Sequence, residues 1–459
     1  MVEHLTPGVY VTEVDNPSLS ISSPTATAVP LFIGRTFNTM DKSGALINVA
    51  RRVDTLGEFE SVFGIAESRR RLTPIRNPNS RQGSRNSAKA SSFSLNDCIR
   101  HFYANGGMTC FVLSVGSPQS SSRLGHLLRR GISAAADTDG PTLVSAPEIS
   151  LLSGTEYEST ATAMLKMCAG TSDRFAILDL PLSAKPTSSD WPKGLAHIDP
   201  IHRSYGAAYY PALATTYSKA ARSKAQSAAR RLSVGRKPDR PTQYLRKPKR
   251  YLTPRAKSKN SADSAELILP PSAAVLGAYV RTDSQRGIWK APANVELRAV
   301  TTLMAQVTDA ELQLLSGTSH GEASLNSIRS LSETGVRIWG ARTLAGPSHE
   351  RLYVPVQRLI MMIETAIKRG AQPLLFESNE PNTWSQLRDA VSLYLTTLWR
   401  AGALSGVKME EAFYVRCGLG ETMTQQDLQV GRLIIEIGIA CLRPAEFVVL
   451  RVHLSMHQS

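Results

Sequence analysis

The sequence has few cysteines, and their spacing brings no two of them close together. Its 459 residues include five cysteines, with no C-x-x-C pair among them. An odd number cannot pair completely, so we expect reduced, buried thiols and neither a disulfide framework nor a zinc site. The five are Cys98, Cys110, Cys168, Cys417 and Cys441.

Long apolar runs are also missing. No uncharged apolar stretch approaches the ~18 residues that a bilayer-spanning helix requires. The first eight residues, MVEHLTPG, contain neither the basic region nor the apolar region of a secretory signal. The sequence therefore predicts a protein that is cytoplasmic during its assembly and has no membrane-inserted segment.

The common catalytic motifs are absent as well. There is no G-x-x-x-x-G-K-[ST] loop, no G-x-G-x-x-G after a strand, no H-E-x-x-H and no G-x-S-x-G. The nine histidines are dispersed, and His101 fits a structural role on a helix. Asp427 and Glu436 have no carboxylate or base at a useful spacing. We therefore expect no enzymatic activity, no catalytic residues, no cofactor and no metal.

One short run invites a catalytic interpretation because it contains a lysine. Lys290 lies between Trp289 and Pro292, but no base or phosphate-binding loop is near it in sequence. We expect Trp289 to anchor a loop and Asn294 to cap a helix that starts at Val295. The tryptophans at apolar positions in the last third are predicted to lie in the core: Trp339, Trp384 and Trp399.

The net charge of +15 is concentrated in one segment. Residues 203–259 contain sixteen basic residues and one acidic residue, which leaves 37 basic and 37 acidic residues elsewhere. A second stretch, 69–92, has seven basic residues and no acidic one. Both stretches are poor in large apolar side chains and cannot offset the entropy of ordering by burial. We expect them to lie on the outer surface and to be dispensable for the fold.

Apolar runs alternate with helical patterns over the first 185 residues. Strands are predicted at 28–34, 110–115, 142–146 and 175–180. Helices are predicted at 95–103, ending before Gly106-Gly107, and around 161–167. This alternation is typical of an α/β layer.

The last third has the most regular periodicity. Residues 356–370 and 384–400 each repeat apolar side chains at helical spacing. The first ends with Lys368, Arg369 and Gly370, and the second stops near Gly402. The two helices should pack on a sheet. A period-two pattern predicts a strand with one apolar face, formed by Leu433, Ile435, Ile437 and Ile439.

These patterns predict a multidomain α+β or α/β protein. A core domain of mixed sheet with packed helices would be accompanied by an inserted α/β domain and by extended terminal arms. The predicted division is an N-terminal arm (1–24), the inserted α/β domain with its basic loop 69–92 (25–185), a basic variable insertion (186–265), the core domain (266–440) and a C-terminal arm strand (441–459).

Both chain ends alternate apolar and polar residues, in 1–20 and 441–459. A strand at a chain end has the fewest partners within its own chain, so we expect both ends to pair with other subunits. The residues predicted to form these intersubunit strands are Val9, Tyr10, Val11, Val14, Phe447, Val448, Val449, Leu450 and Val452.

Eleven short runs together resemble the phage tail sheath family, in particular sheaths of contractile injection systems and contractile bacteriocins. Each run is weak alone, and their order and joint presence are specific. They cover roughly the first 60 residues, 93–185, and 266 to the end, but neither basic segment. The runs are Pro7–Val14, Phe32–Arg35, Asn105–Gly107, Asp173–Asp179, Arg286–Asn294, Arg337–Thr343, Tyr353–Val354, Phe376–Asn379, Leu398–Arg400, Met423–Asp427 and Arg443–Phe447.

The resemblance implies a structural subunit of a hollow helical tube, built from stacked hexameric rings around an inner tube. Such a tube contracts when a baseplate triggers it, and the arms of its subunits complete sheets in their neighbours. The implied partners are other sheath subunits, including paralogues, the inner tube protein, and baseplate and terminal cap proteins. The tube would belong to a phage tail or to a released tail-like particle. The alternatives are a basic nucleic-acid-associated virion protein and an α/β enzyme of unrecognised type.

Overall fold

The computed structural model describes most of the chain, in two compact units. The described residues are 21–22, 26–41, 44–65, 93–118, 123–183, 195, 197–218, 266–311, 323–331, 334–347, 349–374, 377–429 and 431–444. One unit comprises Ala26–Leu359 with Pro444–Ser459, and the other comprises Met1–Thr25 with Ile360–Arg443.

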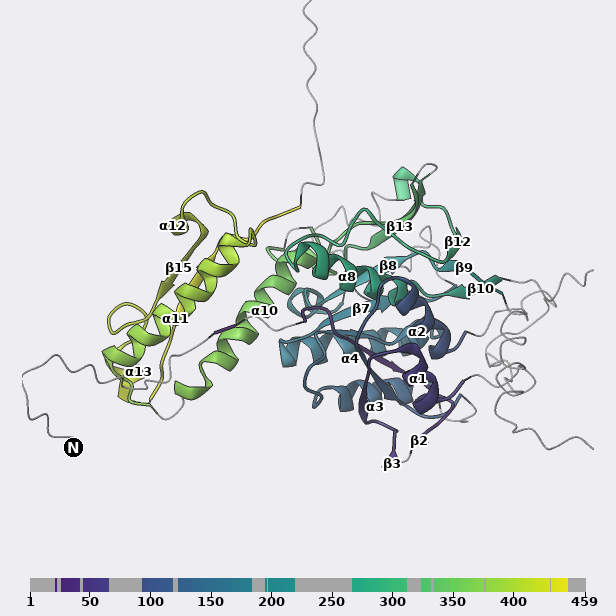
Figure 1. Ribbon diagram of the computed structural model, residues 1–459, viewed down its shortest axis with the longest axis horizontal. Helices are drawn as coiled ribbons and strands as arrows, with labels where there is room; N and C mark the ends of the chain where they lie inside the picture. Colours follow the sequence, from purple (N-terminus) through teal and green to yellow (C-terminus); the bar gives the residue numbers. More distant parts are fainter. Residues whose placement is uncertain are drawn as a thin grey trace, which may run out of the picture. The chain divides into compact units, whose positions relative to one another are not determined.

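The larger unit is built on a nine-stranded sheet (Figure 1). Six neighbouring strands run parallel, from β5 through β1, β6, β7 and β8 to β13, and the edge strands are antiparallel to their neighbours. In spatial order the strands are β11 (Val295–Glu296), β14 (Gly335–Trp339), β13 (Asn326–Leu331), β8 (Gly206–Tyr210), β7 (Phe175–Asp179), β6 (Leu143–Ser145), β1 (Pro30–Gly34), β5 (Cys110–Ser114) and β4 (Ala50–Val53).

Helices cover both faces of this sheet (Figure 1). Helices α2 (Leu95–Ala104) and α8 (Ser272–Arg286) pack together on one face, and α3 (Leu124–Ala135) and α4 (Gly154–Thr171) pack together on the other. Every residue of β1, β7 and β8 is buried, as expected for parallel strands between two helical layers. Shorter helices are α1 (Leu56–Phe63) and α6 (Pro200–Arg203).

Two small sheets complete this unit. Strand β9 (Leu213–Ser218) lies between β10 (Glu266–Leu269) and β12 (Val300–Leu303), and both pairings are antiparallel. A short hairpin joins β2 (Met40–Asp41) to β3 (Gly44–Ala45).

The structure confirms the predicted mixed α and β architecture and the strands and helices of the first 185 residues. Helix α2 shows why the local prediction worked. It begins at a capping box in which the Asp97 carboxylate accepts from the Ser94 amide at 2.9 Å. It ends before Gly106, whose φ of +98° lies in the region that favours glycine.

The prediction of a variable insertion over 186–265 is wrong for residues 200–218. They form α6, β8 and β9, and β8 lies inside the main sheet. Its sequence, GAAYY, has no run of large aliphatic residues, and a Cβ on Gly206 would lie 2.4 Å from Leu165 of α4. Tyr209 is fully buried, and its hydroxyl lies 2.6 Å from that of Tyr279. Residues 69–92 and 219–265 lie outside the described residues.

The predicted boundary between an inserted domain and a core domain does not divide the sheet. Strands β11, β13 and β14 follow the insertion in sequence, yet they extend the sheet that begins with β1. The two compact units divide instead after residues 25 and 359. Pairings between distant segments decide this division, and no local pattern records them.

The smaller unit contains the remaining helices and a two-stranded sheet. Helix α10 (Val354–Gly370) begins in the larger unit, and α11 (Pro381–Arg400), α12 (Met409–Ala412) and α13 (Gln425–Gln429) follow it. The strands are β15 (Phe413–Arg416) and β16 (Glu436–Ile439). The structure confirms both long helices predicted here, and α11 packs against β15.

The predicted strand over 433–439 is shorter than expected. Only Ile437 and Ile439 lie on β16. Leu433 and Ile435 precede the strand and pack against a buried cluster of Trp384, Cys417 and Met423. Burial in this cluster explains their apolar character without a strand.

The three tryptophans predicted to be in the core differ in exposure. Trp384 is buried and Trp399 is half-buried. Trp339 is 38% exposed, and the Arg329 guanidinium lies 6.0 Å from its ring centroid. The prediction for Trp339 is therefore wrong, because burial alternates along β14 and this side chain lies on the exposed face.

The structure also describes the cysteines and the apolar character of the helices. No disulfide joins any two of the five cysteines, and four of them are buried. Within the described ranges, no helix is both long enough and apolar enough to cross a bilayer.

Candidate assembly surface

The nine residues predicted to form intersubunit strands all lie outside the described residues. Residues 1–20 contain four of them and residues 445–459 contain the other five. Their pairing therefore stays a prediction. The described residues do show what such strands could join.

The two-stranded sheet of the smaller unit has open edges within the described part of the chain. Phe413 pairs with Ile439 and Arg416 with Glu436, so β15 and β16 are antiparallel along their whole length. No third named strand joins them. The outer edge of each strand therefore carries backbone donors and acceptors that a further strand can use.

One face of this sheet is apolar, and its two strands differ in burial. Phe413 on β15 is buried, while Ile437 and Ile439 on β16 are only half-buried. Contacts with α11 are made mainly by β15. Half-buried isoleucines beside an open edge are what an additional strand would cover.

The opposite face is polar and closely fitted. The Tyr414 hydroxyl donates to Glu436 Oε1 at 2.8 Å, which raises the pKa of Tyr414, and the Arg416 guanidinium lies 4.8 Å from the tyrosine ring centroid. A Cβ on Gly438 would lie 2.1 Å from the same ring. Glycine is therefore required for the ring to lie across β16.

Side chains from α11 and the preceding loop fix the entry to β16. Trp384 Nε1 donates to Asn379 Oδ1 at 2.6 Å, and Asn379 Nδ2 donates to the Arg432 carbonyl at 2.9 Å. The Thr422 hydroxyl donates to the Ile434 carbonyl at 2.7 Å. The sheet is thus held in place before any partner strand arrives.

The main sheet carries a paired arginine and glutamate at the position where α/β sheets usually bind ligands. That position is the carboxyl end of the strands where the connections reverse direction, here between β1 and β6. Arg35 follows β1 and Glu148 follows β6, and they form an ion pair with 3.0 Å between Nη2 and Oε1. The Arg35 amide also donates to Glu148 Oε2 at 2.8 Å. Both side chains are almost completely buried and fill this position.

Among the buried titratable groups with strongly shifted pKa values, an aspartate and a histidine each have a structural explanation. Burial raises the pKa of Asp179 to about 7, and its Oδ1 accepts from the Ser272 amide at 2.8 Å at the start of α8. Burial lowers the pKa of His101 to about 4, and its Nε2 lies 3.0 Å from the Arg298 carbonyl. The structural role predicted for His101 agrees with this contact.

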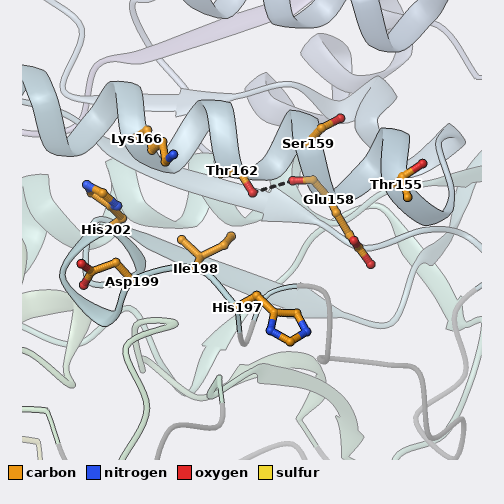
Figure 2. A pocket seen from close by; sticks show the side chains of 9 residues that line it. All are labelled: Thr155, Glu158, Ser159, Thr162, Lys166, His197, Ile198, Asp199 and His202. Carbon is orange, nitrogen blue, oxygen red and sulfur yellow. Dashed lines mark hydrogen bonds between the residues drawn. The ribbon is translucent and has the colours of Figure 1, made fainter.

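The described surface includes an open, polar groove of about 500 Å³ on α4 (Figure 2). Hydroxyl groups along one face of α4 line one wall, and the segment 197–202 forms the other. Thr162 and Ser159 donate their hydroxyls to carbonyls of α4 itself, so these oxygens are already engaged. The lining residues are Thr155, Glu158, Ser159, Thr162, Lys166, His197, Ile198, Asp199 and His202. This arrangement contains no nucleophile paired with a base.

Metal binding finds no support either. Within the described ranges, no three or more histidine, cysteine, aspartate or glutamate side chains converge on a possible metal position.

The lysine-containing run 289–294 forms a turn. Trp289 is half-buried, and its ring lies where a Cβ on Gly287 would be 2.5 Å away. The Lys290 amide donates to the Gly287 carbonyl at 3.1 Å. The predicted helix cap at Asn294 is wrong: this residue has a φ of +56° and leads into β11. Its tolerance of left-handed backbone serves a strand entry instead.

Comparisons with known proteins agree with this description. A family model described as the phage tail sheath C-terminal domain matches residues 348–455. The tail sheath protein of Burkholderia phage BcepMu is 27% identical over 167 residues, which cover 35% of this chain and 34% of that protein. The chain thus spans about a third of the length of this curated relative.

Solved structures match almost the whole chain. The contracted sheath of an extracellular contractile injection system, PVC, is 27% identical with a TM-score of 0.65, over 99% of this chain and 98% of that one. The contracted helical sheath of the anti-feeding prophage is 27% identical with a TM-score of 0.65, over 98% and 99%. Residues 348–455 thus match the C-terminal domain of phage tail sheath proteins, and the fold of nearly the whole chain is similar to that of two contractile sheaths.

The fold gives the runs that resemble sheath proteins a structural explanation that the sequence did not reveal. In the run Asn105–Gly107, Asn105 Oδ1 accepts from the Arg298 amide at 2.7 Å and its Nδ2 donates to the Arg298 carbonyl at 3.2 Å. Asn326 binds the backbone of Arg342 in the same way, at 2.8 Å for both bonds. Each asparagine therefore joins segments that are distant in sequence.

Glycines in these runs serve close packing. A Cβ on Gly107 would lie 2.4 Å from the Phe102 ring, and one on Gly340 would lie 2.7 Å from Asn326 Oδ1. In the sequence, the signal for this packing is an asparagine followed by glycines, as in Asn105–Gly107. Without the fold, this pattern predicts only a turn.

Proposed function

We propose that this chain is a sheath subunit that polymerises into a contractile helical tube around an inner tube and drives that tube through a target envelope. The observation that carries this proposal is the extent of the likeness to two contracted sheaths, which covers 98–99% of the chain. A match over a single domain would support only a shared module. A match over both compact units supports a shared assembly.

The open sheet of β15 and β16 is the element best suited to join subunits. A strand from residues 1–20 or 441–459 of a neighbour would pair with a free edge and cover Ile437 and Ile439. A strand of ~8 residues contributes several backbone hydrogen bonds at ~0.5–1.5 kcal/mol net each, together with the burial of alternate side chains. Such links can persist while the bodies of the subunits rotate.

The free energy for contraction would come from closer body-to-body contact in the contracted tube. The extended tube is then a metastable state that a trigger releases, and no nucleotide is consumed. Arg35 and Glu148 occupy the position between β1 and β6 where such sheets bind nucleotides, which supports a contraction that consumes none. The subunit acts as a structural protein and not as an enzyme.

The proposal also defines the partners and the location. The subunit would contact other sheath subunits, including paralogues, the inner tube protein, and baseplate and cap proteins. It would be cytoplasmic during assembly and later part of a phage tail or a released particle. The alternative of a nucleic-acid-associated virion protein is not favoured, because the matched structures are sheaths.

Negative-stain electron microscopy of the purified protein tests this function. We expect rings or hollow tubes, and tubes of regular length when the inner tube and baseplate proteins are co-expressed. A protein that stays monomeric under all these conditions would contradict the proposal. A salt-sensitive shift of DNA by such a monomer would instead favour the nucleic-acid-associated alternative.

A further inference from the structure

One carboxylate in the larger unit holds two segments that are far apart in sequence. Asp283 Oδ2 lies 2.6 Å from Arg358 Nη2, and its Oδ1 lies 3.1 Å from Arg358 Nη1. The Thr27 hydroxyl donates to Asp283 Oδ2 at 2.7 Å. The Arg358 and Asp283 side chains are 3% and 4% exposed, so this paired fork is shielded from solvent.

The backbone of Thr27 is held as well. Its carbonyl accepts from Arg358 Nη2 at 3.1 Å and from the Thr142 hydroxyl at 2.8 Å. Thr142 Oγ1 in turn accepts from the Val29 amide at 2.9 Å. The segment just before β1 is therefore fixed by side chains from three other parts of the unit.

The position of Asp283 on α8 indicates that its carboxylate stabilises the contact with Arg358 and Thr27 and does not stabilise the helix itself. It lies in the last turn of α8, where a negative charge opposes the helix dipole. The Arg358 guanidinium offsets that cost and lies 5.0 Å from the centroid of the Tyr279 ring on the same helix. An acid here is favourable only with its partners in place.

The two residues joined by Asp283 flank the places where the chain leaves this unit. Thr27 follows the first crossing, after residue 25, and Arg358 precedes the second, after residue 359. We propose that Asp283 is a positioning residue that fixes where the N-terminal arm leaves the body and ties this exit to the start of α10. The inference rests on the proposed function, because it gives the arm a fixed origin from which to reach a neighbour.

The double variant Asp283→Leu/Arg358→Met tests this anchor. Apolar side chains of similar size can replace a buried ion pair without unfolding the protein, but they remove both bonds from Asp283 and Arg358 to Thr27. We expect the Val29 amide to exchange with deuterium about tenfold faster than in the wild type, while exchange within β1 is unchanged. We also expect fewer tubes by negative-stain microscopy.

Two variants at Thr27 distinguish the loss of its hydroxyl bond to Asp283 from a general effect on folding. Thr27→Ser keeps the bond to Asp283 and should behave as the wild type, whereas Thr27→Val removes it and should shift in the direction of the double variant. Unchanged Val29 exchange in the double variant, or tubes in wild-type yield, would overturn the proposal. If the wild type itself forms no tubes, the proposed function fails, and the exchange measurement alone decides whether Asp283 anchors the segment.

Discussion

Gly277 is the residue at which α2 and α8 come closest. A Cβ there would lie 2.6 Å from the Phe102 carbonyl oxygen and 2.7 Å from the Asn105 Cβ. In an open helix, Gly→Ala stabilises by up to about 1 kcal/mol. Here we expect Gly277→Ala to lower the free energy of unfolding by about 1–3 kcal/mol, because two helices must move apart. Urea denaturation measures this change.

Gly170 provides the matched control, since it lies in α4 and no atom is within 4 Å of its would-be Cβ. Gly170→Ala should be neutral or slightly stabilising. A Gly277→Ala variant as stable as the wild type would show that the contact between α2 and α8 is looser than described.

Asp179 makes a prediction about pH. Its folded pKa of about 7 lies above the ordinary value of 3.8, so the folded protein holds this proton more tightly than the unfolded chain does. The stability contributed by the group is therefore present at low pH and is lost as the pH rises from about 4 to about 7. The difference between the two pKa values corresponds to a change in the free energy of unfolding of about 4 kcal/mol at most.

Asp179→Asn keeps an acceptor for the Ser272 amide and does not titrate. We expect the difference in unfolding free energy between wild type and variant to favour the wild type progressively as the pH falls from 8 to 4. Comparing the two proteins at each pH cancels the contribution of His101, which has the opposite sign. A constant difference across this range would contradict the buried, weakly bonded state of Asp179.

The C-terminal segment is the element whose role can be tested most directly. Deleting residues 446–459 should leave a folded protein with an unchanged thermal unfolding midpoint that no longer forms tubes, because the strand predicted for a neighbour's sheet is gone. Circular dichroism and negative-stain microscopy measure the two properties. A tail of the same length made of glycine and serine serves as the control and should not restore tubes, whereas normal tubes from the truncated chain would refute the role of this strand.

Elements with a strong local pattern could be predicted from the sequence, and those defined by distant partners could not. Helices α10 and α11 repeat apolar residues at helical spacing, and β1, β5 and β7 are short apolar runs. Strand β8 escaped prediction because its burial comes from α8 and from neighbouring strands. The sequence predicts a helix from Val295, where the structure has β11, because the partner of this strand, β14, lies some forty residues later.

The candidate site followed the same rule. Alternation at the two ends predicts strands for other subunits, but the receiving sheet of β15 and β16 needed the fold. The pairing of Asp283 with Arg358 and Thr27 also left no trace in local sequence, because their separations are 75 and 256 residues.

On the scale of the whole molecule, we expect that most of the excess positive charge can be removed without loss of the fold. Ser218 and Glu266 pair in the hairpin of β9 and β10, so a two-residue Asn-Gly turn can replace residues 219–265. These residues contain fifteen basic and two acidic side chains, and their removal lowers the net charge from +15 to +2. We expect the shortened chain to unfold at the same temperature and still to form tubes.

Calorimetry and microscopy test that expectation. Replacing 219–265 by a glycine-serine segment of equal length controls for chain length. A shortened chain that fails to fold, beside a folded control, would show that this hairpin needs a longer connection.

The ion pair between Arg35 and Glu148 has a mechanical consequence. In comparable α/β sheets this position is a crevice at the carboxyl ends of the strands, where ligands bind. Here a buried ion pair, with a further hydrogen bond from the Arg35 amide to Glu148, joins the ends of β1 and β6 and braces the sheet at that point. A sheet held in this way transmits a displacement without deforming internally. Contraction of the tube should then change the spacing and rotation of rigid bodies, while distances inside each body stay constant.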